Sequence, residues 1–264
     1  MNRPAHETKH LTELQYTLPN GTRVCIAQDA SSADSTGRTV WLGAQVLAVY
    51  LHDVLKPPRP SLPGGRRKRV LELGSGTGLL GLSLFSLGYD TLATDLDFIV
   101  AGVLAQNVER NLDVIKTGGA GEARMEKRVL DWFVEPIRWE GHVDRGADRG
   151  TRLLEPPFDL IVTADTVYDS SLSEPLLRTL HGLARSSPSA PIYLALERRD
   201  PALVDSFLSS AAETWGFKCS QVEHARLRRV VESKEGTLAW EADAWDGVEV
   251  WKLKLGREKA GKRR

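Results

Sequence analysis

Hydrophobic and polar residues change their spacing several times along the chain, and each change predicts a different element. Between residues 13 and 27, two short apolar segments flank Asn20-Gly21, and Asn-Gly between such segments is a strong signal for a β-hairpin. A polar connection follows over 28–39, after which apolar residues recur at helical spacing over 41–55. The chain is therefore expected to open with a hairpin and a helix.

From residue 70 onward, apolar strands alternate with helical patterns, which is typical of a parallel sheet in an α/β fold. The continuous apolar segment over 158–163 fits a strand that is covered on both faces. Asp200-Pro201 predicts a helix start, with an N-cap followed by a first-turn proline. The pattern predicts helices over 78–88, 97–112 and 172–183 and from Pro201, and strands over 70–73, 91–95, 125–130, 158–163, 192–196, 217–222 and 248–255.

Three segments lack such periodicity. Residues 56–69 contain four prolines and six cations without an acid, which predicts an exposed basic loop. Its RRKR end is either a solvated strand edge or a patch for nuclear targeting or an acidic partner. Residues 139–157 resemble a surface insertion, and the charged tail is expected to be disordered. We therefore divide the chain into an N-terminal extension over 1–40, a main domain over 41–255 and a basic tail over 256–264.

Composition narrows the class of protein. The 264 residues carry 35 Lys plus Arg against 35 Asp plus Glu, so contact with nucleic acid would have to come from a local basic patch. Only Cys25 and Cys219 are present, far apart and without a CxxC pair, which fits a reducing compartment. No signal peptide and no membrane span is recognisable. We expect a cytoplasmic location, with the nucleus as an alternative, and no membrane partner.

A glycine-rich turn, ELGSGTG over 72–78, joins a buried strand to a helix and marks the expected ligand site. The dinucleotide fingerprint needs its third glycine at the position of Leu79, whereas here it falls at Gly78, which weakens an NAD interpretation. The carboxylate of Glu72 would also repel a pyrophosphate. S-Adenosylmethionine, which carries a sulfonium and an ammonium against one carboxylate, fits a site with this acid better.

Asp95 ends the next strand, 21 residues after Gly74. That is the spacing at which an acid accepts hydrogen bonds from ribose hydroxyls, although both cofactors contain a ribose. Two plainer alternatives remain open at this stage. Asp95 would only cap the following helix, or Glu72 would be a solvated strand end.

Over roughly residues 40–200, the sequence resembles the seven-strand methyltransferase-like protein-lysine methyltransferases, often called methyltransferase family 16. The matching features are a Trp before the glycine turn, AQNVERNL with Asn107 and Asn111, Asp131-Trp132, and Ala164-Asp165-Thr166-Val167-Tyr168 after the fourth strand. The resemblance implies a Rossmann-like, doubly wound sheet in the order 3-2-1-4-5-7-6 with its seventh strand antiparallel. It also implies that cofactor contacts come from Trp41, Gly74, Ser75, Gly76, Asp95, Trp132 and Ala164, and that Asp165 and Tyr168 border the target-lysine channel.

The chemistry of methyl transfer suggests roles for the last two residues. Asp165 would hold and orient an incoming ammonium as its proton leaves to solvent, and the ring of Tyr168 would wall the channel and attract a cation. For Tyr168, Trp132 and Trp41, ordinary packing is the alternative. His6 and His10 lie in a polar terminus without a third ligand, so no metal site is expected.

The expected activity is thus S-adenosylmethionine-dependent methyl transfer to a lysine side chain of a protein substrate. Two alternatives keep the same fold: methylation of a small molecule, and a noncatalytic protein-binding scaffold. A small-molecule enzyme would need a lid, and the short N-terminal region offers little material for one. Glu197-Arg198-Arg199, at the end of the fifth strand, would either contact a protein substrate or form exposed ion pairs.

Overall fold

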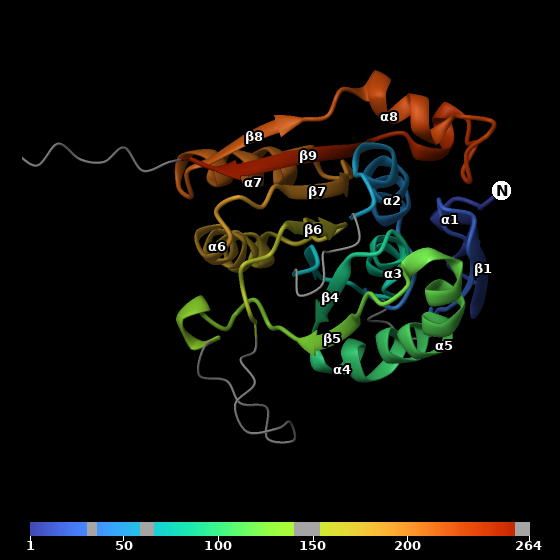
Figure 1. The fold of residues 1–264 in the computed structure, drawn as a ribbon. Helices are drawn as coiled ribbons and strands as arrows, with labels where there is room; N and C mark the ends of the chain where they lie inside the picture. The colour runs from blue at the N-terminus through green and yellow to red at the C-terminus, as the bar shows by residue number, and fades with distance from the viewer. Residues whose placement is uncertain (31–35, 59–65, 140–153, 257–264) are drawn as a thin grey trace, which may run out of the picture.

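A seven-stranded sheet forms the centre of the computed structural model, which describes residues 1–30, 36–58, 66–139 and 154–256 (Figure 1). The strands lie in the order β5-β4-β3-β6-β7-β9-β8, and β9 alone runs antiparallel to its neighbours β7 and β8. This confirms the order and the antiparallel seventh strand implied by the resemblance. The strands are β3 (Arg69–Leu73), β4 (Asp90–Asp95), β5 (Met125–Val129), β6 (Leu160–Ala164), β7 (Ile192–Glu197), β8 (Phe217–Gln221) and β9 (Val248–Leu255).

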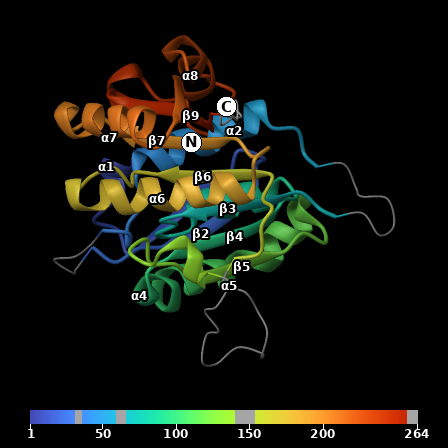
Figure 2. The same cartoon turned by 90° about the vertical axis from the view of Figure 1, so that its left-hand side faces the viewer.

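Helices cover both faces of this sheet, so alternate strand residues enter two different hydrophobic cores (Figure 2). On β3, Val70 packs with the helices of one face, whereas Leu71 and Leu73 pack with those of the other. Residues of α2 (Leu42–Val54), α3 (Leu79–Ser86), α5 (Ala105–Ile115) and α8 (His224–Val231) belong to the first core. Residues of α6 (Ser170–Ser186) and α7 (Pro201–Glu213) belong to the second.

The expected hairpin is present as a separate two-stranded sheet of β1 (Glu13–Thr17) and β2 (Arg23–Ala27). Two asparagines of α5 bind the free edge of β2. Asn111 accepts from the backbone N–H of Cys25 at 2.9 Å and donates to its carbonyl at 2.9 Å. Asn107 binds both backbone groups of Ala27 and also donates to the carbonyl of Thr77 at 2.9 Å. These bonds satisfy an edge strand and connect the hairpin to the glycine turn.

Most of the other predicted elements are also present. The side chain of Asp200 accepts from the backbone N–H of Leu203 at 3.1 Å, which confirms it as the N-cap of α7. The predicted helix over 97–112 is a series of short segments with a kink at Gly102. The segments are α4 (Asp97–Ile99), η1 (Val100–Leu104) and α5, and η2 (Lys116–Ala120) follows beyond the predicted end.

Several short elements have no counterpart in the predictions: α1 (Ala5–Thr8), α8, η3 (Pro136–Arg138) and η4 (Ala242–Trp245). At the RRKR segment, Arg66 pairs with Asp159 at 2.9 Å and Arg67 pairs with Glu122 at 3.2 Å, as expected of a solvated strand edge. The predictions for 59–65, 140–153 and 257–264, and the part of the polar connection over 31–35, lie outside the described residues. Within the described ranges, no helix has the length and apolar character needed to cross a bilayer.

Candidate active site

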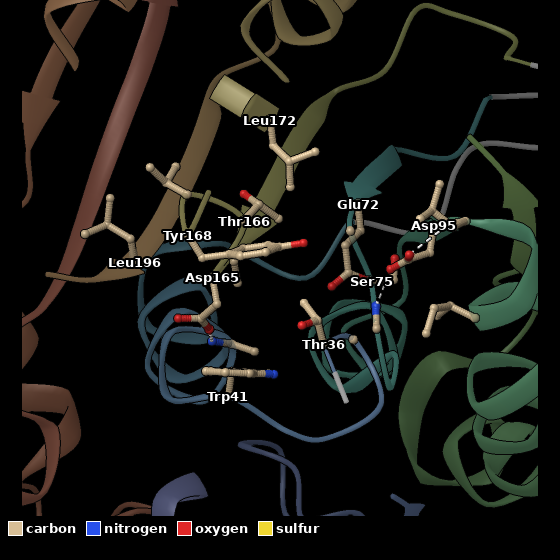
Figure 3. A pocket seen from close by; sticks show the side chains of 18 of the residues that line it. Thr36, Trp41, Glu72, Ser75, Asp95, Asp165, Thr166, Tyr168, Leu172 and Leu196 are labelled. Atoms are coloured by element: carbon tan, nitrogen blue, oxygen red, sulfur yellow. Dashed lines mark hydrogen bonds between the residues drawn. The ribbon is translucent and has the colours of Figure 1, made fainter. Parts of the chain in front are cut away.

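A cavity of about 730 Å³ opens beside the carboxyl ends of β3, β4, β6 and β7 (Figure 3). A volume of this size suits a cofactor or another ligand of several hundred daltons. All ten candidate residues line it, which places segments from across the sequence around one space. They are Trp41, Glu72, Gly74, Ser75, Gly76, Asp95, Trp132, Ala164, Asp165 and Tyr168. Their individual roles stay predictions.

The glycine turn needs glycine for both conformation and space. Gly74 and Gly76 have φ angles of 64° and 52°, in the left-handed region that other residues rarely adopt. A Cβ on Gly74 would lie 2.7 Å from Cγ2 of Thr166, and one on Gly76 would lie 2.8 Å from the carbonyl oxygen of Gly37. Ser75 joins the turn to β4, since its hydroxyl accepts from the backbone N–H of Thr94 at 3.0 Å. The backbone is therefore held close to the cavity without side chains in the way.

Asp95 stabilises the turn from the neighbouring strand. Its Oδ2 accepts from the N–H of Gly76 at 2.8 Å and its Oδ1 from the N–H of Leu96 at 2.7 Å. Burial raises the pKa of this carboxyl, while the two amides lower it. Leu96 is itself the N-cap residue of α4, and no side chain caps that helix. The alternative that Asp95 merely caps the helix is therefore wrong.

Glu72 lies under α3 with only 2% of its surface exposed, so the solvated alternative for this residue is also wrong. Burial raises its pKa to about 8, helped by the nearby charge of Asp95 and opposed by the hydroxyl of Ser75. Its Oε2 has no hydrogen-bond partner among the described residues. That oxygen is buried against Gly81 of α3, while the residue also lines the cavity, so its carboxyl adds an acidic group beside the space where a cationic ligand group would lie.

Asp165 approaches the cavity from the other side, at the end of β6. Its backbone has a φ of 57°, and its Oδ2 accepts from the N–H of Ala44 in the first turn of α2 at 3.0 Å. A Cβ on Gly43 would lie 2.6 Å from that oxygen, so only glycine allows this approach. Burial raises the pKa of Asp165 to about 7, and the charge of Glu197 raises it further, against the α2 amides and Arg199.

Trp41 stands beside this carboxyl with cations over its ring. Nζ of Lys9 lies 3.3 Å from the ring centroid, and Cζ of Arg199 lies 4.8 Å from it. Arg199 also pairs with Glu197, and both of these residues line the cavity. The two alternatives for this strand end were contact with a protein substrate and an exposed ion pair. They do not exclude each other, because the ion pair faces the cavity.

Tyr168 lies between the two sides (Figure 3). It is 53% exposed, which contradicts the alternative of a core aromatic. Phe98 and Phe133 are 49% and 58% exposed and line the same cavity. Trp132 is half-buried and also packs against the second core, so for this residue packing and cavity lining coincide. The cavity thus has an apolar rim of a kind that usually marks binding surfaces.

Sequence reasoning missed part of this lining. Thr36, Gly37 and Thr39 belong to the polar connection before α2, yet they line the cavity, and Gly37 lies against Gly76. The N-terminal region therefore contributes part of the lining, which the sequence did not indicate. Gly43 and Ala44 were missed as well, because their contact with Asp165 spans 121 positions of sequence. The only local sign was a glycine in the first turn of a helix.

Comparison with known proteins agrees with this geometry. A family profile described as lysine methyltransferase matches residues 20–214 of the chain. The chain belongs to the lysine methyltransferase family. The family match begins at the turn of the hairpin, covers β2, the glycine turn and the Asp165 turn, and extends through α7.

Similar proteins include the protein-lysine N-methyltransferase rrg1 of Schizosaccharomyces pombe, 28% identical over 161 residues, or 61% of this chain. The protein N-lysine methyltransferase METTL21A of Danio rerio is 31% identical over 185 residues, or 69% of this chain. The match spans 46% of rrg1 and 70% of METTL21A. A putative SAM-dependent methyltransferase from Streptococcus mutans shares the fold, with a TM-score of 0.50 and 13% identity over 92% of this chain and 56% of that one.

S-Adenosylmethionine is the cofactor of this family member, and the residues at the β3 and β4 side of the cavity fit it. The glycine turn presents backbone without side chains, Asp95 offers carboxylate oxygens to ribose hydroxyls, and the carboxyl of Glu72 in the lining suits a cationic group. The exposed aromatic rim can cover an adenine. We call this side the cofactor end (72–76 and 95), and the opposite side the target end (Trp41, Asp165, Tyr168, Glu197 and Arg199). Trp41 is included in the target end by its position beside Asp165, although the resemblance implied a cofactor contact for it.

Proposed function

We propose that the protein is an S-adenosylmethionine-dependent protein-lysine N-methyltransferase. The observation that carries this proposal is the target end, where carboxyl groups and aromatic rings meet in one cavity with the cofactor end. Carboxylates and aromatic faces both attract an alkylammonium, the form in which lysine arrives at neutral pH. The substrate that this arrangement suits best is therefore a lysine side chain.

S-Adenosylmethionine supplies a methyl group bonded to a cationic sulfur, so the remaining requirement is an unprotonated amine held in line with that bond. Asp165 is fixed by amides at the start of α2, and it lines the cavity, where its carboxyl can orient an amine. Its pKa of about 7 lies below the roughly 10.4 of a free lysine, so the proton is lost to solvent rather than held by this carboxyl. We therefore assign Asp165 to positioning the amine, with catalysis coming from orientation and exclusion of water.

A protein substrate is favoured by the exposed rim of Phe98, Phe133 and Tyr168, because an enclosed metabolite would not need an open apolar mouth. Nucleic acid is disfavoured because the formal net charge is zero and part of the RRKR segment is already paired with carboxylates. The small-molecule alternative gains from the contact between Gly37 and Gly76, which covers part of the cofactor end. An experiment must therefore detect both methylated proteins and methylated small molecules.

The test incubates the enzyme with tritiated S-adenosylmethionine and a cell lysate, and then separates proteins from small molecules. We expect label in discrete protein bands. Asp95→Ala should abolish most of it, whereas Asp97→Ala, an exposed neighbour that does not line the cavity, should not. Label confined to the small-molecule fraction would support the other enzyme class. If no methyl group is transferred and calorimetry detects no binding of S-adenosylhomocysteine, the result would support a noncatalytic protein-binding scaffold.

A further inference from the structure

Lys9 is delivered to the target end by an ordered segment of the N-terminus. Its backbone N–H donates to the carbonyl of Ala5 at 3.1 Å, which closes α1. The side chain of Gln28 then donates to the carbonyls of Thr8 and Leu11 at 2.9 and 3.1 Å, on either side of Lys9. These bonds fix the main chain on both sides of Lys9. The flexible side chain of Lys9 therefore projects from a fixed backbone position.

The ammonium of Lys9 meets the groups of the target end. It lies 3.3 Å from the centroid of the Trp41 ring. Burial lowers its pKa, as does the nearby charge of Arg199, whereas the charges of Glu197 and Asp165 raise it. All four of these neighbours line the cavity. Lys9 therefore lies near an aromatic face and two carboxyl groups, the same groups that bind a substrate lysine in the proposed function.

This amine is held loosely enough to move. Within the described ranges, Lys9 forms no ion pair, so its charge is not fixed by a carboxylate. A cation over an aromatic face contributes about 0.5 to 2 kcal/mol, which thermal motion overcomes readily. Rotation about the four-carbon stem moves the nitrogen by several ångströms while the backbone stays in place. Partial burial also increases the fraction of the neutral, nucleophilic amine.

We infer that Lys9 is a methylation site of the enzyme itself, modified within the same molecule. The inference rests on the proposed function. In the reaction, the Lys9 ammonium first loses a proton to water. Its nitrogen lone pair then forms a bond to the methyl carbon as the bond from carbon to sulfur breaks. The sulfur keeps that electron pair, and the products are methylated Lys9 and S-adenosylhomocysteine.

The test is mass spectrometry of the purified full chain after incubation with S-adenosylmethionine alone. We expect the mass of added methyl on the peptide that contains Lys9, at a fraction that does not change when the enzyme is diluted. Lys9→Arg should lose this label. Lys218→Arg, at an exposed lysine of β8 outside the cavity, should keep it. A labelled fraction that grows with enzyme concentration would show transfer between copies and overturn the inference.

A second measurement needs no cofactor. Competitive acetylation across a pH range, read for each lysine by mass spectrometry, gives the pKa of individual amines. We expect a midpoint for Lys9 below the ordinary value of a lysine, and a midpoint at that ordinary value would contradict a buried place beside Trp41. If lysate proteins are methylated but Lys9 is not, this inference fails and the proposed function stands. If neither is methylated, both fail.

Discussion

The two ends of the cavity are built in different ways. At the cofactor end, the decisive bond joins Asp95 to Gly76, only 19 positions apart, across two adjacent strands. At the target end, the decisive bond joins Asp165 to Ala44, 121 positions apart. The cofactor end is thus formed by residues close in sequence, in two adjacent strands and the turn after the first. The target end is formed only when distant parts of the domain have folded together. Local motifs therefore identify a cofactor more readily than a substrate.

The buried carboxyl groups show the same contrast. Glu72 at the cofactor end and Asp165 at the target end have pKa values raised by burial, to about 8 and about 7. Asp165 is bound by an amide of α2, whereas one oxygen of Glu72 has no partner in the described part of the chain. The carboxyl at the cofactor end is therefore enclosed under α3, and the one at the target end is anchored to the start of α2. Substitutions at the two ends should separate binding from transfer.

The largest effect is expected for Asp95→Ala at the cofactor end. The change removes the ribose acceptor and the bond to the N–H of Gly76. Affinity for S-adenosylhomocysteine should fall by about 1.5 to 3 kcal/mol, the cost of losing hydrogen bonds to a charged partner. Titration calorimetry checks this, with Asp97→Ala as the control. Unchanged affinity would remove Asp95 from the site.

Asp165→Asn should act at the other end. The amide oxygen of Asn can still accept from the N–H of Ala44, so α2 should stay in place and cofactor affinity should change little. Methyl transfer should fall about ten-fold, which corresponds to about 1.4 kcal/mol of transition-state stabilisation.

Rates at saturating S-adenosylmethionine test this prediction, with Asp246→Asn, at an exposed carboxyl outside the cavity, as the control. A wild-type rate would refute the positioning role of Asp165. A loss of cofactor binding would instead move this residue to the cofactor end.

Glu72→Gln should change the pH dependence of stability. The folded pKa of Glu72 is about 8 and its ordinary value is 4.5, so its contribution to stability is present below 4.5 and is lost as the pH rises through 8. Gln stays neutral and avoids this loss. The variant should therefore gain at least about 1 kcal/mol over wild type at high pH and nothing at low pH, since even one of the roughly 3.5 pKa units between 4.5 and 8 corresponds to about 1.4 kcal/mol.

Urea unfolding across that pH range measures the difference. The exposed Glu213→Gln should give a flat difference and serves as the control. A flat difference for Glu72→Gln as well would mean that the carboxyl is not desolvated, and the proposed acceptor for a cationic group would be lost with it.

The smallest effect is expected for Tyr168→Phe. The ring, which lies between the two ends, is retained, and only the hydroxyl is removed. Methyl transfer should change less than about three-fold, because less than about 0.7 kcal/mol is at stake. Tyr168→Ala removes the ring and should cost about ten-fold. Equal losses in the two variants would assign the role to the hydroxyl instead of the aromatic wall.

The sequence predicted most of the fold because its signals are local. Continuous apolar segments, the Asn20-Gly21 turn and the Asp200-Pro201 cap depend on neighbouring residues, and the structure contains all of the corresponding elements. The glycine turn and Asp95 were found for the same reason. The short helices α1 and α8 were missed because they have only 4 and 8 residues, too few to show a helical period, and are stabilised by packing on the rest of the domain.

The candidate site was predicted only in part because some of its contacts are not local. No pattern near Asp165 indicates that Gly43 must be small to admit its carboxylate. The cover that Gly37 places over Gly76 likewise depends on the path of a polar connection that has no periodicity. The exposure of Tyr168 and the burial of Glu72 were open alternatives that three-dimensional packing decided. The sequence therefore predicted which residues line the cavity, but not the burial and contacts of each side chain.

The most direct test of the account is the chemical identity of the methylated product. Lysate proteins labelled with tritiated S-adenosylmethionine by the Lys9→Arg enzyme, and separated from that enzyme, would be hydrolysed to amino acids and resolved by chromatography. We predict that the radioactivity elutes with methylated lysine, and that Asp165→Asn lowers it while leaving the affinity for S-adenosylhomocysteine nearly unchanged. Label that elutes instead with methylated arginine or histidine, or as a base-labile ester, would contradict the assignment of the target end to a lysine side chain.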